Sequence, residues 1–196
     1  MRNYNCELIG TITNIEVAED INFVLNIKRS NGKEDFIPCF SSNINKNIIL
    51  TEGSYVRVLG VVKSIKKDKD YRPSLRVDCV FVEELKQDST IGDKNKVFGR
   101  FQVKYPMKSK EVGSGTLVKD IILESTPNGI PDSEFKAVIW NDYVTKFDKI
   151  QQGTEVYVIG RIQSRDFMVQ TDDGGRHMRS HEVTVIKMWN DSERTE

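Results

Sequence analysis

The chain has 196 residues, enough for one or two domains, and its 29 lysines and arginines balance 29 aspartates and glutamates. A net charge of zero excludes a global cationic field, so any affinity for nucleic acid must come from local faces. The sequence has no apolar run near the roughly 20 residues of a membrane span and no signal-peptide pattern at its N-terminus, which predicts a cytoplasmic protein.

The first elements of the chain are expected to be strands. Alternating apolar and polar residues predict strands over residues 4–17, 21–28 and 34–40, with a hairpin turn signal, SNG, at residues 30–32. Residues 41–50 form a polar, asparagine-rich connector with room for one or two helical turns. The N-terminal part therefore begins as an antiparallel sheet.

A repeat then appears along the chain. Residues 52–60 (EGSYVRVLG) are restated at residues 152–160 (QGTEVYVIG), and Phe40 and Trp140 are separated by the same offset. Strand, connector, glycine, strand and glycine recur in both copies, which indicates a duplicated unit. By the shared offset, Phe40 is expected to occupy the position of Trp140.

Each copy closes with a hairpin and a fifth strand, at residues 75–83 in the first and about 179–187 in the second. Five strands with a short helix between the third and the fourth are the strand count of an OB-fold barrel. No long amphipathic helices alternate with the strands, which argues against a doubly wound α/β fold. The predicted fold is all-β, with two tandem five-stranded OB-fold barrels and a short helix in each repeat.

The polar run at the centre of the chain predicts the boundary between the units. The expected organisation is a diverged first domain, a linker, a second domain and a short tail, at residues 1–86, 87–96, 97–190 and 191–196.

The second unit holds two strands with an unusual mixed face. Phe135, Ala137 and Ile139 would share a buried side of the first strand, opposite Lys136, Val138 and Trp140. In the next strand the valines point inward, while aromatic and arginine residues point outward. Cations suit phosphates and flat rings suit unpaired bases, whose stacking contributes about 1–3 kcal/mol each, so this face predicts a single-stranded nucleic-acid site.

The candidate binding residues are aromatic or cationic side chains on this face, on neighbouring strands and on the equivalent strands of the first unit. In the second unit they are Trp140, Phe167, Arg165, Arg161, Tyr157, Lys136, Arg100, Lys104, Lys108 and Lys110. In the first unit they are Phe40, Arg57, Lys63, Lys67 and Tyr71.

Several of these residues have a second interpretation that the sequence leaves open. Trp140 is also compatible with a place in the core, and Tyr157 packs in a barrel as readily as it contacts a base. Arg161 and Arg165 are equally typical of a solvated strand face. The first unit, with more lysines and fewer rings, is either a weaker binder or a packing and dimerisation surface.

Two connections are expected to flank the binding channel, as in other OB-folds. The loop at residues 105–115 follows Lys104 and carries Lys108 and Lys110, and the hairpin at residues 168–178 forms the opposite wall. Two aspartates at the hairpin tip, Asp172 and Asp173, disfavour phosphate, so the tip is expected to point away.

Residue types that carry catalysis or hold metals are sparse. The three cysteines, Cys6, Cys39 and Cys79, lack CxxC spacing, which favours reduced thiols. His177 and His181 would share a strand face without the third ligand that zinc needs. No acid–base pair or nucleophile motif is present, so a protein without enzymatic activity, cofactor or metal is expected.

The second unit resembles the bacterial single-stranded DNA-binding protein family. The resemblance covers roughly residues 95–189 and lies in the strand ending at Trp140, in the run from Gly153 to Arg165 and in the late strand at residues 182–185. It implies that Trp140, Arg165 and Phe167 stack bases or meet phosphates. It also implies a homodimer with four OB-folds in total.

One departure from that family concerns the C-terminus. The family commonly ends in an acidic tail with an apolar tip, which is not found at residues 191–196. Recruitment of replication or recombination proteins by that route is therefore in doubt, and an accessory version carried by a phage or plasmid would be compatible with such a chain.

The sequence predicts a protein that binds single-stranded DNA with little sequence preference, in replication, recombination or repair. Two alternatives stay open. One is an OB-fold module that binds protein partners in a primosome or recombination complex. The other is a binder of single-stranded RNA, because the sequence does not reveal whether the site would accept or reject the 2′-hydroxyl that distinguishes RNA from DNA.

Overall fold

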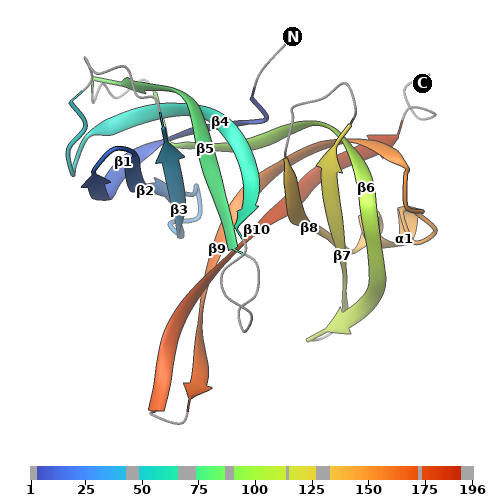
Figure 1. Cartoon of the computed structure of the whole chain (residues 1–196). Coiled ribbons are helices and arrows are strands. Elements are labelled where there is room, and N and C mark those ends of the chain that lie inside the picture. The colour runs from blue at the N-terminus through green and yellow to red at the C-terminus, as the bar shows by residue number, and fades with distance from the viewer. Residues whose placement is uncertain are drawn as a thin grey trace.

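The computed structural model describes residues 4–42, 49–65, 74–86, 91–113, 115–126, 133–171 and 174–190. Within these ranges it is an all-β protein with one short helix (Figure 1), which confirms the predicted class. No helix in the described part of the chain has the length and apolar character to cross a membrane.

The strands follow one another in two sets along the chain. The first set is β1 Cys6–Val17, β2 Ile21–Lys28, β3 Glu34–Ser41, β4 Tyr55–Ile65 and β5 Ser74–Glu84. The second set is β6 Lys94–Val112, β7 Thr116–Ser125, β8 Glu134–Trp140, α1 Asp142–Lys146, β9 Glu155–Thr171 and β10 Gly174–Asn190.

Strand pairing closes the first set into a five-stranded barrel, here called the N-terminal ring. β1 pairs with β2 and β4, β2 with β3, and β5 with β4, all antiparallel, while β3 and β5 pair in parallel. The second set, the C-terminal ring, repeats this order with β6 to β10 and a parallel β8–β10 pair. Pairing of β1 with β6 joins all the strands into a 10-stranded sheet.

The alternation seen in the sequence explains why these segments form strands with one buried side. In β2, Phe23, Leu25 and Ile27 are buried, whereas Asn22 is exposed. In β8 the predicted inward set of Phe135, Ala137 and Ile139 is fully buried. Branched and aromatic residues at every second position thus place one strand face in the core and leave the other for function.

The two rings also share their irregularities. β1 and β6 each carry a register shift, at Ile12/Asn14 and Val103/Tyr105. Gly60 and Gly160 lie at equivalent close approaches, because a Cβ on either would come 2.7 Å from a carbonyl oxygen of the neighbouring strand, that of Asp78 or that of Thr184. A side chain at either position would clash with the neighbouring strand, so both positions require glycine.

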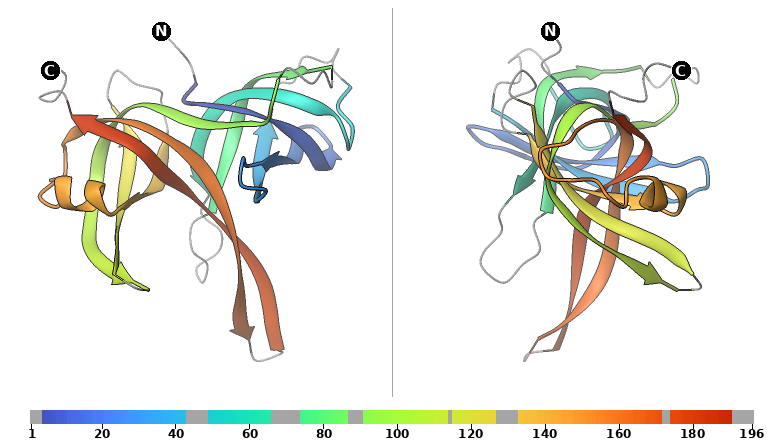
Figure 2. Two further views of the ribbon diagram at one scale, coloured as in Figure 1. Left: turned by 180° about the vertical axis from the view of Figure 1, so that it is seen from behind. Right: turned by 90° about the vertical axis from the view of Figure 1, so that its right-hand side faces the viewer.

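Two segments expected as a loop and a hairpin tip are extended strand instead. β6 continues to Val112, and β9 and β10 run out to Thr171 and Gly174. The resulting β6–β7 arm (residues 105–122) and β9–β10 arm (residues 165–180) project from the rings toward the same side (Figures 1 and 2).

The strand β6 begins inside the expected linker. It starts at Lys94 and pairs with β1 from that residue onward, so residues 94–96 are part of the sheet. Residues 87–90 lie outside the described part of the chain, as do residues 43–48, where the helix of the first repeat was expected. The expected helix of the second repeat is α1.

A buried polar network ties the rings together. The fully buried carboxylate of Asp35 accepts a hydrogen bond from Arg29 Nε at 2.7 Å and one from the backbone N–H of Ser164 at 3.0 Å. His181 of β10 lies 3.0 Å from the hydroxyl of Ser74 and 2.8 Å from the carbonyl oxygen of Phe36. These bonds connect β9 and β10 with β3 and β5, so the two rings contact each other well beyond the β1–β6 ladder.

Candidate nucleic-acid interface

The candidate interface lies on the outer side of β7, β8, β10 and β9. Its polar and aromatic side chains, here called the Trp140 face, are Asp120, Lys136, Trp140, Arg161, Arg165 and Glu182. The strand registers place them on one side, with Gln163 opposite Glu182 and Arg161 opposite Thr184. Of the predicted outward set in β8, Lys136 and Trp140 are half-buried, whereas Val138 is buried beneath the face.

Trp140 and Arg165 are in contact. The guanidinium carbon of Arg165 lies 5.6 Å from the centroid of the Trp140 ring, within the range of a cation–π interaction. Two buried donors of this face, Trp140 Nε1 and Arg161 Nε, have no hydrogen-bond partner among the residues that the structure describes. Buried N–H groups are normally paired, so these two donors are unusual; neither atom is accessible to solvent, and an outside acceptor would reach them only after the side chains move.

Two cations of the Trp140 face, Lys136 and Arg165, are paired with carboxylates, which the sequence did not predict. Glu182 lies 2.8 Å from Arg165 Nη2 and 3.8 Å from Lys136 Nζ. Asp120 lies 3.0 Å from Lys136 Nζ and 3.6 Å from Lys110 Nζ. The two acidic side chains are only 14% and 15% exposed, so this chain of ion pairs runs across β7, β8, β10 and β9.

Tyr157 is engaged in an internal stack. Its ring lies parallel to that of Trp189, with 5.6 Å between the centroids, and Arg100 lies 5.8 Å from the same ring. Arg100 also forms an ion pair with Glu155. Of the two interpretations of Tyr157, the structure favours packing, because its ring already has a stacking partner.

The β9–β10 arm carries Phe167, which is half-buried and lies opposite Met178. Near its base, Arg179 forms a hydrogen bond of 2.6 Å with Asp166 and lies 4.3 Å from the ring of Phe36, so the arm packs against the N-terminal ring. The bonds from Arg179 lower the pKa of Asp166 below its usual value.

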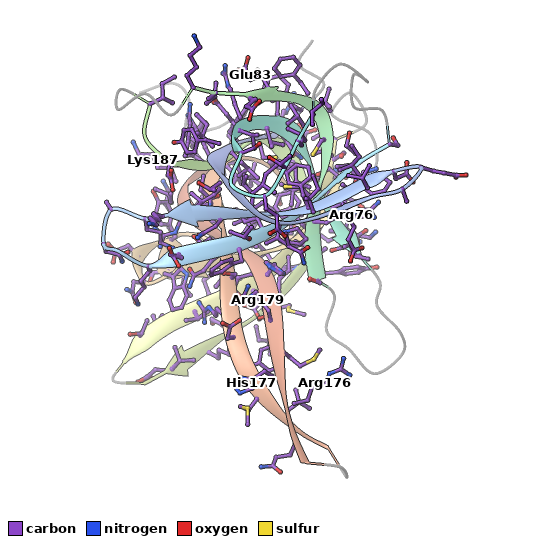
Figure 3. All side chains as sticks on the ribbon, turned by 90° about the vertical axis from the view of Figure 1, so that its left-hand side faces the viewer. Arg76, Glu83, Arg176, His177, Arg179 and Lys187 are labelled. Atoms are coloured by element: carbon purple, nitrogen blue, oxygen red, sulfur yellow. The ribbon has the colours of Figure 1, made fainter. Side chains whose placement is uncertain are left out.

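Farther along the arm, Figure 3 shows Arg176 and His177 well beyond Arg179. Both are exposed, and neither was among the candidate binding residues. The predicted orientation of Asp172 and Asp173 lies outside the described residues.

The three predicted lysines of β6 lie in different settings. Lys104 pairs with Glu134 and, at 3.3 Å, with Glu124, and the hydrogen bonds to these carboxylates raise its pKa. Lys108 is exposed, and Lys110 faces Asp120.

The β6–β7 arm presents exposed apolar residues that the sequence analysis missed. Tyr105 is 54% and Met107 is 48% exposed. Their signal in the sequence was weak, because β6 is exposed from Tyr105 to Val112 and shows no alternation of buried and exposed residues there.

In the N-terminal ring the candidates are also paired. Arg57 lies 2.8 Å from Glu7 and 3.3 Å from Glu83, and Lys63 lies 3.1 Å from Asp78. Lys67 and Tyr71 lie outside the described residues.

Phe40 does not occupy the position of Trp140. When Gly60 is matched with Gly160, the registers place Phe40 opposite Asp78 and its counterpart Val138 opposite Thr184. Phe40 instead contacts Arg76, whose guanidinium carbon lies 4.2 Å from the ring centroid. Arg76 was not among the predicted residues, because its contact with Phe40 comes from a parallel strand pair that the sequence does not reveal.

His177 and His181 lie on β10, but His181 is buried and bonded to Ser74 and Phe36. Among the described residues there is no group of histidines, cysteines and carboxylates that could hold a metal ion. The three cysteines are free thiols, and burial raises the pKa of Cys6 and Cys39 above the usual value. The cysteines therefore pack in or against the hydrophobic core of the N-terminal ring.

Comparison with solved structures gives the fold. A deletion variant of the single-stranded DNA-binding protein from Thermus aquaticus superimposes with a TM-score of 0.69 and 14% identity, over 98% of this chain and 96% of that chain. The wild-type protein gives the same TM-score and identity, over 95% of this chain and 92% of that chain. No protein-family model and no curated protein sequence matches the chain. At this identity the likeness establishes an OB-fold architecture and nothing further.

Proposed function

We propose that the chain is a tandem of two OB-fold barrels, divided within residues 87–96, that binds single-stranded DNA with little sequence preference. The observation that carries the proposal is the Trp140 face, where the guanidinium carbon of Arg165 lies 5.6 Å from the ring centroid of the half-buried Trp140. Rings of this kind stack on unpaired bases, while the cations meet phosphates.

The proposed role is protection of single strands during replication, recombination or repair. A homodimer with four barrels is part of the proposal, as are contacts with replication or recombination proteins. The equivalence of the two rings, down to the matched register shifts and glycines, supports the tandem arrangement.

Titration of a labelled oligo-dT with the full chain tests the function. We expect saturable binding that weakens as salt is raised, with a slope smaller than that of a strongly basic protein because stacking contributes part of the affinity. Duplex DNA of the same length, whose base faces are hidden, is expected to bind much more weakly. Absence of a complex with oligo-dT at low salt would overturn the proposal, and tighter binding of a matched RNA would redirect it to RNA.

Replacing Glu182 by glutamine tests how the ion pairs affect binding. We expect oligo-dT to bind about two- to fivefold more tightly, because the loss of this charge releases Arg165 to the phosphates and removes a repulsion, while Lys136 keeps its ion pair with Asp120. The dependence of log Kd on log salt should also become steeper, by about 0.7 for each added phosphate contact. Glu19→Gln, an exposed site that removes the same charge, is the control. Weaker binding of the Glu182 variant would instead mean that the ion pair with Glu182 holds Arg165 in the position in which it contacts the DNA.

A further inference from the structure

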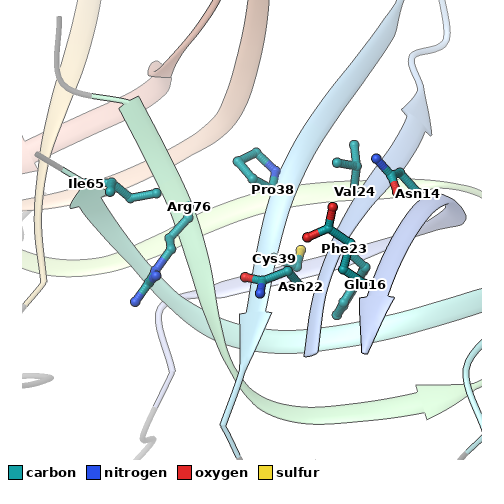
Figure 4. Close-up of a pocket in the computed structure, with 9 residues that line it drawn as sticks. All are labelled: Asn14, Glu16, Asn22, Phe23, Val24, Pro38, Cys39, Ile65 and Arg76. Carbon is teal, nitrogen blue, oxygen red and sulfur yellow. The ribbon is translucent and has the colours of Figure 1, made fainter. Parts of the chain in front are cut away.

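A groove of about 230 Å³ lies on the outer side of the N-terminal ring, across β1, β2, β3 and β5 and the end of β4 (Figure 4). Its lining includes the apolar side chains of Val24, Pro38 and Ile65. Its volume is below the ~300–1,000 Å³ of drug-sized ligand sites, so it suits a single small ring system and not a large cofactor.

The strand registers explain why the groove is open. When Val77 is matched with Val183, Pro38 takes the position of Lys136 and Arg76 takes that of Glu182. In the C-terminal ring the long side chain of Lys136 reaches Glu182 and Asp120 and covers this part of the sheet. The short ring of Pro38 leaves the equivalent space unfilled in the N-terminal ring.

The polar side of the groove consists of Asn14, Glu16 and Asn22, which lie on the paired strands β1 and β2. All three side chains are exposed, and none of them makes a hydrogen bond or ion pair within the described part of the chain. Across the groove, Arg76 is held by Asp78 at 2.6 Å and lies 4.2 Å from the Phe40 ring. A carboxylate and two amides thus face an apolar floor, with a cation and a ring beside it.

We infer that this groove binds one base of the single strand and selects a base that carries an exocyclic amine. A carboxylate accepts hydrogen bonds but donates none, so Glu16 matches the N4 amine of cytosine, or the corresponding amines of guanine and adenine. Thymine has no such amine and would place a carbonyl oxygen near the carboxylate. The inference rests on the proposed function and adds to it a base preference within a largely unselective interface.

The test compares oligo-dT with oligo-dC, because the two pyrimidines have rings of equal size and differ in the amine. For the wild-type chain we expect dC to bind about five- to tenfold more tightly than dT of the same length. Glu16→Ala should bring the dC/dT ratio close to one. Glu19 lies in the turn between β1 and β2, is exposed and does not line the groove. Glu19→Ala should therefore leave the dC/dT ratio at its wild-type value.

The two proposals fail in different ways. Equal affinity of the wild-type chain for dC and dT overturns the groove assignment while the proposed function stands. A dC preference that survives in Glu16→Ala overturns it as well, because the preference then arises elsewhere. Failure to bind either oligonucleotide overturns both proposals together.

Discussion

Replacing Asp35 by alanine should lower the free energy of unfolding by about 3–5 kcal/mol, the usual cost of removing one member of a buried ion pair. Asp35 is fully buried, and Arg29 beside it is only 11% exposed, so the guanidinium would be left without its partner. The same change removes an acceptor for the N–H of Ser164 and for the amide of Asn95 at 3.4 Å. Chemical denaturation followed by circular dichroism measures the loss.

The neighbouring residue supplies the control. Glu34 lies next to Asp35 on β3, but its carboxylate is exposed and lies 4.0 Å from Lys28. Glu34→Ala should change the free energy of unfolding by no more than about 1 kcal/mol, as for other surface ion pairs. A loss of about 1 kcal/mol or less from Asp35→Ala, as small as that from Glu34→Ala, would show that this buried network contributes little to stability.

The second large effect is expected on binding. Trp140→Ala should weaken the complex with oligo-dT by about 1–3 kcal/mol, because one stacked base loses its ring. Trp140→Phe, which retains a smaller ring, should lose less. Fluorescence anisotropy of a labelled oligonucleotide measures the affinity, and circular dichroism checks that each variant is folded.

Trp189 is the matched control for that experiment. It stacks on Tyr157 at 5.6 Å, and Trp189→Phe should preserve this stack and the affinity for oligo-dT. If Trp140→Ala is folded and binds as tightly as wild type, the Trp140 face is not the interface. If that variant unfolds, the indole is a core residue after all.

Local patterns in the sequence predict the elements with a buried side well. Residues 21–28 were expected as a strand from their alternation, and β2 has those bounds. The β6–β7 arm was missed because β6 is exposed on both faces from Tyr105 to Val112, so no alternation of buried and exposed residues marks the strand. A pattern of burial does not reveal a strand that has no buried side.

Features that depend on pairing between distant strands were also out of reach. The offset of the glycine repeat placed Phe40 at the position of Trp140, but the connectors before Gly53 and Gly153 differ in length, so the true counterpart of Phe40 is Val138. The partners of Arg165 and Lys136, on β10 and β7, were likewise not visible in the sequence. The sequence placed Arg165 and Lys136 on this face of the sheet, but it did not reveal the carboxylates that pair with them.

The pairing of β1 with β6 affects how a nucleic-acid strand would bind if it contacts both rings. Because Cys6 pairs with Val97 within one continuous sheet, the two rings are joined by strand pairing and not only by a flexible linker. A nucleic-acid strand bound to one ring would meet the other ring at a distance set by the protein, and therefore at a constant effective concentration. The affinity for an oligonucleotide would then rise abruptly at the length that lets one molecule contact both rings.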